Sequence, residues 1–469
     1  MGFSPAGILY ISFIFYLIVS KRHFFAHLVF LCVVTEMFLQ MGVIVKIGNY
    51  TMEMKNLSED ILILYCIAHI NKIPPRLKKG WILLIISYII PMLLLIFFPS
   101  NALVANMSVS WDKILLDGAS PVHPIINGEV IKAVFKVILF SFVTLYLFIH
   151  WGETEFSWLI KRLSKISTIF MLLGLLEFLI RNILGLNEVW GSFLLFFFGD
   201  TESTVYEGHL RGDVYGLNLF TREPAAYSMT LFLVLVIKMA VNRLNGEKRI
   251  IDWTIGLGVF LMILSTSMSA YIYVVIFFVL YLLYRWIIKC PKYMKYEKIL
   301  LFIVLSLVSS SAIYYLGLSD DYVAQRISNI INNLDSFLAV DWDYSSVGDK
   351  SSQVRLLSIV QTFVVFLERP IFGYSLFSIV CHGATPQYLA GVGLFGMVCW
   401  IRFYYYLIPL RLLMSPQKNA YILCIILYVI TVLFGGWLIR PYYDLMLIIY
   451  VISCCFLFSN IKKMPKTSN

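Results

Sequence analysis

Residues 80–99 read GWILLIISYIIPMLLLIFFP, a run of 20 residues without a charged side chain. An α-helix rises about 1.5 Å per residue, so about 20 apolar residues span the roughly 30 Å hydrocarbon core of a bilayer. The core holds no water to hydrogen-bond the backbone, and a lone apolar segment satisfies its own amides only as a helix. The stretch therefore predicts a transmembrane helix.

The rest of the chain repeats this pattern. Of 469 residues, 60% are hydrophobic and 14% are charged, and the mean hydropathy is +0.83. Soluble domains average about 45–50% apolar and about 25% charged residues. We expect an all-α polytopic membrane protein with about 13 transmembrane helices, forming a single integral-membrane domain over residues 1–469. The predicted spans are residues 4–20, 24–45, 56–71, 80–99, 131–150, 166–182, 217–241, 251–266, 268–286, 299–317, 391–410, 420–438 and 443–459.

The net charge is +10, and the Lys and Arg residues cluster in the connections between predicted spans. Cytoplasmic connections of membrane proteins are enriched in these residues. With the N-terminus placed outside, every second connection is basic, and the C-terminus is then cytoplasmic. No basic stripe with interleaved aromatic residues marks a nucleic-acid-binding domain, so nucleic acid is not an expected partner. The basic groups are Lys21/Arg22, Lys72/Arg76/Lys78/Lys79, Lys161/Arg162/Lys165, Arg243/Lys248/Arg249, Arg285/Lys289/Lys292/Lys295/Lys298, Arg411/Lys418 and Lys462/Lys463/Lys466.

Three connections on the predicted external side are long: residues 100–130, 183–216 and 318–390. The last is the largest, and it contains the apolar run VRLLSIVQTFVVFL over residues 354–367. This run is too short to cross a membrane and is followed by Pro370 and Gly373, which end helices. We expect a helix that lies on the membrane surface or covers a cavity. Residues 318–390 are thus predicted to form a large, partly helical external loop.

A set of arginines on the predicted external side opposes the positive-inside trend. An Arg side chain presents a planar fork that binds phosphate through two hydrogen bonds and stays charged when partly buried. Several such residues around one cavity would suit a diphosphate. The alternative for each is a local ion pair with a nearby carboxylate. The set is Arg181, Arg211, Arg222, Arg326, Arg355, Arg369 and Arg440.

The segment RGDVYGLNLFTREPAAY, residues 211–227, precedes the core of the seventh predicted span. Two interpretations of Glu223-Pro224 remain open. Pro is tolerated at a helix start, and Glu is favoured near the positive end of the helix dipole. The functional interpretation makes Glu223 an acid/base group or a partner of a nearby Arg.

This segment resembles the "R…G…F…EPS/EPN" signature of bacterial O-antigen and capsule polymerases of the Wzy type. A second stretch, SQVRLLSIVQTFVVFLERPIFGY over residues 352–374, is similar to a run in the large external loop of the O-antigen polymerase and ligase superfamily. A third, QYLAGVGLFG over residues 387–396, resembles the segment that re-enters the membrane there. The turn at residues 264–269 resembles the family's "LTxSR" corner without its Arg. The resemblance covers mainly residues 205–410.

The resemblance implies a GT-C-like helical fold in the bacterial inner membrane and undecaprenyl-diphosphate-linked oligosaccharides as substrates. The nascent chain would leave its lipid carrier and join a hydroxyl of the next lipid-linked repeat unit, on the outer face and without a metal or cofactor. Membrane lipid and a chain-length regulator protein are the implied partners. Of the candidate catalytic residues Arg211, Glu223, Arg355 and His382, the first three match motif positions of the family; the candidate substrate-binding residues are Arg222, Arg326, Arg369 and Tyr388.

Three further points bear on the function. Thr385 stands where the O-antigen ligases have a His, which favours a polymerase over a ligase; His382, three residues earlier, is either a general base or an ordinary loop residue. A lipid-oligosaccharide flippase is the alternative from another class, although the chain shows no internal repeat of the kind common in transporters. The acidic residues Asp335, Asp341, Asp343 and Asp349 lack the regular spacing of a metal site.

Overall fold

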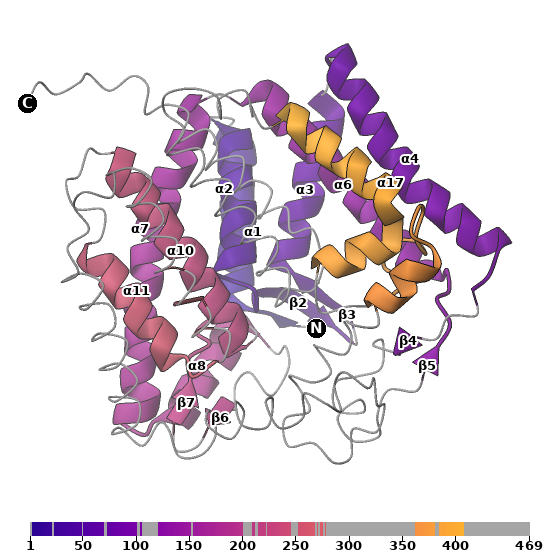
Figure 1. Cartoon of the computed structure of the whole chain (residues 1–469). Helices are drawn as coiled ribbons and strands as arrows, with labels where there is room; N and C mark the ends of the chain where they lie inside the picture. Colours follow the sequence, from indigo (N-terminus) through magenta and orange to yellow (C-terminus); the bar gives the residue numbers. More distant parts are fainter. Residues whose placement is uncertain are drawn as a thin grey trace, which may run out of the picture.

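The computed structural model is mostly helical (Figure 1). It describes residues 2–20, 23–48, 50–69, 73–100, 104–105, 121–151, 153–199, 209–211, 214–221, 223–244, 252–267, 362–379 and 384–407, with a few single positions between 270 and 277. The helices are α1 (Pro5–Ser20), α2 (Phe24–Met37), α3 (Met54–His69), α4 (Pro75–Phe97), α6 (Gly128–His150), α7 (Glu153–Phe178), the π-helix η1 (Leu179–Ile183), α8 (Asn187–Phe198), α10 (Pro224–Leu244), α11 (Trp253–Leu264) and α17 (Ala384–Leu407).

The helices pack in two groups around α2. On one side α2 packs against α3, α3 against α6, α6 against α4, and α4 against α17. On the other side α2 contacts α7, which forms a three-helix group with α10 and α11. Figure 1 shows α7, α10 and α11 on the left and α4, α6 and α17 on the right.

Seven short strands accompany the helices within the described residues, which the expectation of an all-α fold missed. β1 (Gly2–Phe3), β2 (Val43–Ile47) and β3 (Tyr50–Glu53) form an antiparallel sheet, and two hairpins pair β4 (Val104–Ala105) with β5 (Pro121–Val122) and β6 (His209–Arg211) with β7 (Val214–Gly216). The labelled strands gather at the lower end of the helices in Figure 1. We call this the strand-bearing end.

The helix ends that the charge pattern assigns to the outside meet at the strand-bearing end. α3 begins directly after β3, and α10 begins eight residues after β7. α4 ends shortly before the β4–β5 hairpin, and α6 begins shortly after it. The topology, including the side of the membrane that this end faces, remains a prediction.

Three described helical segments are long and apolar enough to cross a membrane: Leu77–Phe97, Gly128–Leu147 and Trp158–Ile183. They correspond to the predicted spans 80–99, 131–150 and 166–182. Six other predicted spans contain helices α1, α2, α3, α10, α11 and most of α17. Large apolar side chains on α1 and α4, such as Phe15 and Phe97, are exposed, as lipid-facing residues would be. Several helices of this length and hydropathy are typical of a membrane protein.

Several predicted boundaries are wrong. The span 24–45 is a helix only to Met37, because the chain then turns into β2; the span 217–241 becomes helical only at Pro224. The connection 183–216 contains helix α8, and the basic group at 161–165 lies inside α7 instead of a loop. Other predictions lie outside the described residues. They are the spans 299–317, 420–438 and 443–459, most of the span 268–286, and residues 318–361 of the large loop.

The last described helix is broken by glycine. α17 has non-helical dihedral angles at Gly393, whose φ is 65°. On either side of this kink the chain is paired with residues 370–375: Leu394 donates its N–H to the Pro370 carbonyl at 2.9 Å, and Ser375 donates to the Gly391 carbonyl at 2.8 Å. The preceding helix, residues 362–368, ends just before Pro370, as predicted for the end of the apolar run. Residues 362–379 and α17 thus form one folded-back unit against α4.

We predict that Gly393→Ala destabilises the protein by at least about 2 kcal/mol. An added Cβ would clash with the carbonyl group of Ile371, at a φ that favours glycine. The matched control is Gly256→Ala in α11, where a Cβ meets nothing within 4 Å. That change is expected to be neutral or to stabilise by up to about 1 kcal/mol. Thermal unfolding of the purified proteins checks both, and equal midpoints would contradict the prediction.

Candidate functional site

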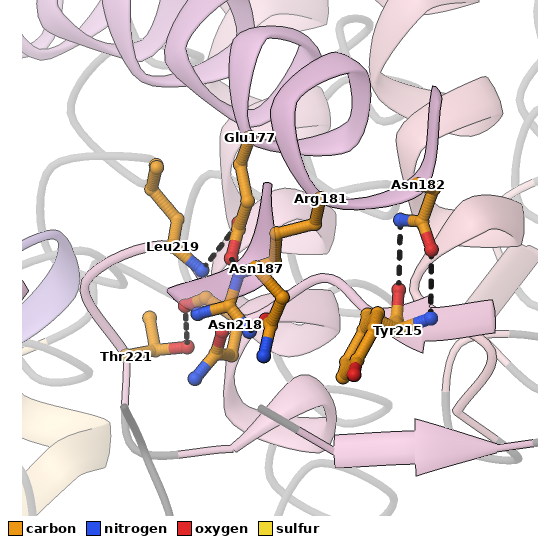
Figure 2. A network of polar contacts seen from close by, with 8 residues as sticks. All are labelled: Glu177, Arg181, Asn182, Asn187, Tyr215, Asn218, Leu219 and Thr221. Atoms are coloured by element: carbon orange, nitrogen blue, oxygen red, sulfur yellow. Dashed lines mark hydrogen bonds and ion pairs between the residues drawn. The ribbon is translucent and has the colours of Figure 1, made fainter. Parts of the chain in front are cut away.

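The stretch with the 211–227 signature begins as a β-hairpin that η1 holds in place. Arg211 pairs with Val214 at the turn of the β6–β7 hairpin. Asn182 of η1 donates from Nδ2 to the Tyr215 carbonyl at 3.1 Å, and the Tyr215 N–H donates to Asn182 Oδ1 at 2.7 Å (Figure 2). One amide side chain therefore satisfies both backbone groups of a strand residue, which fixes the hairpin against the helix.

Residues 217–221 form a buried loop between β7 and α10. Buried backbone groups need partners, and this loop finds several outside itself. The Leu219 N–H donates to Glu177 Oε2 of α7 at 2.7 Å, and the Phe220 carbonyl accepts from the Met41 N–H at 3.2 Å. Leu219 has a φ of 45°, and the turn is closed by the Thr221 N–H, which donates to the Asn218 carbonyl at 2.8 Å.

Glu177 is also one half of a fully buried ion pair. Arg181 Nε lies 3.2 Å from Glu177 Oε1, and both side chains are 0% exposed. Arg181 Nη1 donates to Asn187 Oδ1, at the start of α8, at 3.1 Å. The pair spans the change from α7 to η1, and π-helical segments of this kind are frequent at functional sites. Figure 2 shows Glu177, Arg181 and Asn182 reaching from one helical segment toward the loop and the hairpin.

The loop also meets the corner that follows α11. A Cβ on Gly216 would lie 3.0 Å from both the Ser265 carbonyl oxygen and Thr266 Oγ1, which is tighter than most Cβ contacts, so the missing side chain eases this approach. The Ser228 and Ser265 hydroxyls are 2.8 Å apart and join α10 to the same corner. Two stretches that carry the family resemblance, 211–227 and 264–269, are thus in contact.

Glu223 lies exposed just before α10. Its carbonyl accepts from the Tyr227 N–H at 3.0 Å and from Thr221 Oγ1 at 3.2 Å, and Pro224 is the first residue of the helix. The helix-start interpretation of Glu223-Pro224 is therefore confirmed, and the acid/base role stays a prediction. Of the other predicted site residues, Arg222, Arg326, Arg355 and His382 lie outside the described residues. The predicted meeting of Arg211 with Arg355 stays a prediction for that reason.

Arg369 and Tyr388 both contact α4 or the residues after it. Arg369 Nη2 donates to the Phe98 carbonyl at 2.7 Å, which caps the end of α4 with a cation where the helix dipole favours one. The Tyr388 hydroxyl donates to the Tyr88 hydroxyl at 2.9 Å, and its side chain is buried. These contacts position α17 and the preceding segment; the predicted substrate contacts of both residues stay predictions.

Tyr374 completes the segment that carries Arg369. The Arg369 guanidinium lies 4.8 Å from the centre of the Tyr374 ring. Burial raises the pKa of the Tyr374 phenol above its ordinary value, so the hydroxyl stays protonated and donates to Glu368 Oε2 at 2.7 Å. Among the described residues, no three His, Cys, Asp or Glu side chains gather in a way that would hold a metal ion.

Glu177 and Asn182 were not singled out by the sequence reasoning, although a signal for Glu177 exists. It lies inside a predicted span, four residues before Arg181, and ionisable groups inside spans are functional candidates by default. Asn182 has no comparable signal, because a single amide near a span end is common.

Comparison of the chain with protein-family models, with curated proteins and with solved structures finds no match.

We predict that Asn182→Ala loosens the β6–β7 hairpin. The change removes two hydrogen bonds to the backbone of Tyr215, which is half-buried, and should cost about 1–3 kcal/mol. Thermal unfolding measures the loss, and hydrogen exchange of the Tyr215 amide localises it. Asn56→Ala is the control, because exposed Asn56 makes only a long 3.4 Å contact with Glu53. An unchanged exchange rate of the Tyr215 amide in Asn182→Ala would contradict the role of Asn182 in holding the hairpin.

Proposed function

We propose that the chain is an integral-membrane glycosyltransferase that joins undecaprenyl-diphosphate-linked oligosaccharide repeat units on the outer face of the bacterial inner membrane. The observation that carries the proposal is the contact between two resemblance-bearing stretches, 211–227 and the corner after α11, at Gly216 and Ser265. Because α10 and α11 pack side by side, the start of α10 and the end of α11 meet, and both stretches share one place at the strand-bearing end. The third stretch, residues 387–396, supports the proposal through the glycine kink of α17.

The proposed reaction breaks the bond between the nascent chain and its diphosphate carrier and forms a glycosidic bond to a hydroxyl of the next repeat unit. Undecaprenyl diphosphate leaves with the bonding electron pair, and the hydroxyl proton passes to a base, for which Glu223 and His382 are the candidates. Negative charge grows on the diphosphate as it departs. Arg211 and Arg355, with Arg222, Arg326 and Arg369 as substrate-binding partners, would stabilise that charge, and each well-placed donor contributes a few kcal/mol.

The proposed topology has thirteen spans in a GT-C-like arrangement, an external N-terminus and a cytoplasmic C-terminus. The strand-bearing end would then face outward, where it presents Arg211 and Glu223 to substrates whose sugars lie outside the membrane. Membrane lipid and a chain-length regulator protein are the partners that this function implies. The metal-independent mechanism rests on the arginines alone.

Deletion of the chain from its host distinguishes the proposal from its alternatives, ligation of finished polymer and flipping of lipid-linked units. Loss of a polymerase leaves lipid A core that carries one repeat unit. Loss of a ligase leaves long chains on undecaprenyl diphosphate, and loss of a flippase traps single units on the inner face. We expect the first pattern on a lipopolysaccharide gel. A normal ladder of chain lengths in the deletion strain would refute the proposed function.

We predict that Arg211→Lys and Arg355→Lys each lose most polymer formation while the protein inserts at normal levels. Lys supplies a point charge without the planar fork that binds a diphosphate. If the two arginines only anchored loops through surface ion pairs worth about 0–1 kcal/mol, Lys would serve nearly as well. The control is Arg162→Lys, an exposed position near the other end of α7 that lies 5.8 Å from the Trp158 ring. Gel ladders of complemented deletion strains measure all three variants, and near-normal ladders in both test variants would count against the proposal.

A further inference from the structure

Loop 217–221 is buried yet belongs to no helix or strand, so its conformation depends on partners outside it. The Leu219 N–H is the amide at its centre, and the acceptor 2.7 Å away is a side chain of α7, Glu177 Oε2. The positive φ of Leu219 is uncommon for a residue other than glycine. An external acceptor is therefore what holds this residue in a conformation that the chain does not favour by itself.

Glu177 is held in turn by Arg181. A carboxylate that is 0% exposed needs a counter-charge, and Arg181 Nε supplies it at 3.2 Å. Replacement of a buried ion pair by apolar residues of similar size is often neutral or stabilising, whereas removal of one partner is strongly destabilising. The pair is thus a poor device for stability alone. What it provides is an acceptor of fixed position, which faces the backbone amides of Asn218 and Leu219 in the loop.

The loop lies between the residues that the proposed function uses. Arg211 precedes it at the hairpin turn, and Glu223 follows it at the start of α10. The loop is the covalent link between the hairpin, which Asn182 holds, and the start of α10, which the corner after α11 holds, so its conformation sets how these two segments lie relative to each other. We infer that Glu177, held by Arg181, is a positioning residue that fixes loop 217–221 and so sets the placement of Arg211 and Glu223. This inference rests on the proposed function.

Two double variants that differ only in the side chain at position 177 test the inference. In E177Q/R181M both charges are gone, but the amide oxygen of the introduced glutamine still accepts from the Leu219 N–H. In E177L/R181M both charges are gone and so is the acceptor. Because neither variant leaves an unpaired buried charge, both are expected to fold. A purely structural role of the ion pair predicts the same behaviour for the two.

Hydrogen exchange of residues 217–221 in the full chain, purified in nanodiscs, is the primary readout. Loss of the acceptor leaves the Leu219 amide without a partner, and we expect it to exchange at least about tenfold faster in E177L/R181M than in E177Q/R181M. The polymer ladder in complemented cells should be retained in E177Q/R181M and largely lost in E177L/R181M. Equal exchange rates in the two variants would overturn the inference.

The control uses the ion pair of buried Glu59 with half-buried Lys136, which joins α3 to α6 and has no hydrogen bond to the loop. E59Q/K136M and E59L/K136M should both leave the hydrogen exchange of residues 217–221 at the wild-type rate. If they accelerated it as much as E177L/R181M does, the inference would be overturned, because the faster exchange would then reflect a general loosening of the protein. Faster exchange in E177L/R181M with an unchanged ladder would support the role of Glu177 in fixing the loop and refute the assignment of Arg211 and Glu223 to the reaction. The two failures are thus distinguishable.

Discussion

The hydrogen bond from the Leu219 amide to Glu177 depends on a general constraint: a backbone N–H or carbonyl hidden from water must find a partner. Regular helices meet this constraint internally, but the segments between them do not. In this chain, polar side chains serve backbone groups in the short strands and at a helix end. Asn182 serves both groups of Tyr215, Arg369 serves the carbonyl at the end of α4, and the Ser4 hydroxyl donates to the Val43 carbonyl. These contacts fix the short strands and the end of α4 against their neighbours.

The same constraint places most of the interhelical polar contacts at the strand-bearing end. Lys55 pairs with Glu36 at 3.4 Å between α3 and α2, and the Tyr10 hydroxyl donates to the Met54 carbonyl at 3.0 Å. At the opposite end of α3 the contacts are largely aromatic, as where the His69 imidazole stacks on Tyr65 at 4.0 Å. Along α3, polar contacts thus fix the strand-bearing end, and aromatic packing fixes the opposite end.

Much of this arrangement could be predicted from the sequence. Apolar runs such as residues 80–99 predicted helices, because this signal is local. Boundaries failed where a tertiary contact decides them: α2 stops at Met37 so that the chain can enter β2, which pairs with β1 and β3. In the candidate site, too, local sequence signals were visible and tertiary contacts were not. The motif residues of 211–227 were visible, but Asn182 acts through one backbone contact across 33 residues, and no pattern in the sequence marks such a partner.

The first sheet has a consequence for how the chain is made. β1, which precedes α1, pairs Gly2 with Lys46 and Phe3 with Val45. Synthesis runs from the N-terminus, so β1 is made before its partner strand and stays unpaired until residues 43–47 have emerged. Closure of this sheet therefore follows the synthesis of α1 and α2 and joins the start of the chain to the segment after α2. An affinity tag fused directly ahead of Gly2 would stand at this junction, which makes the far end of the chain the better place for one.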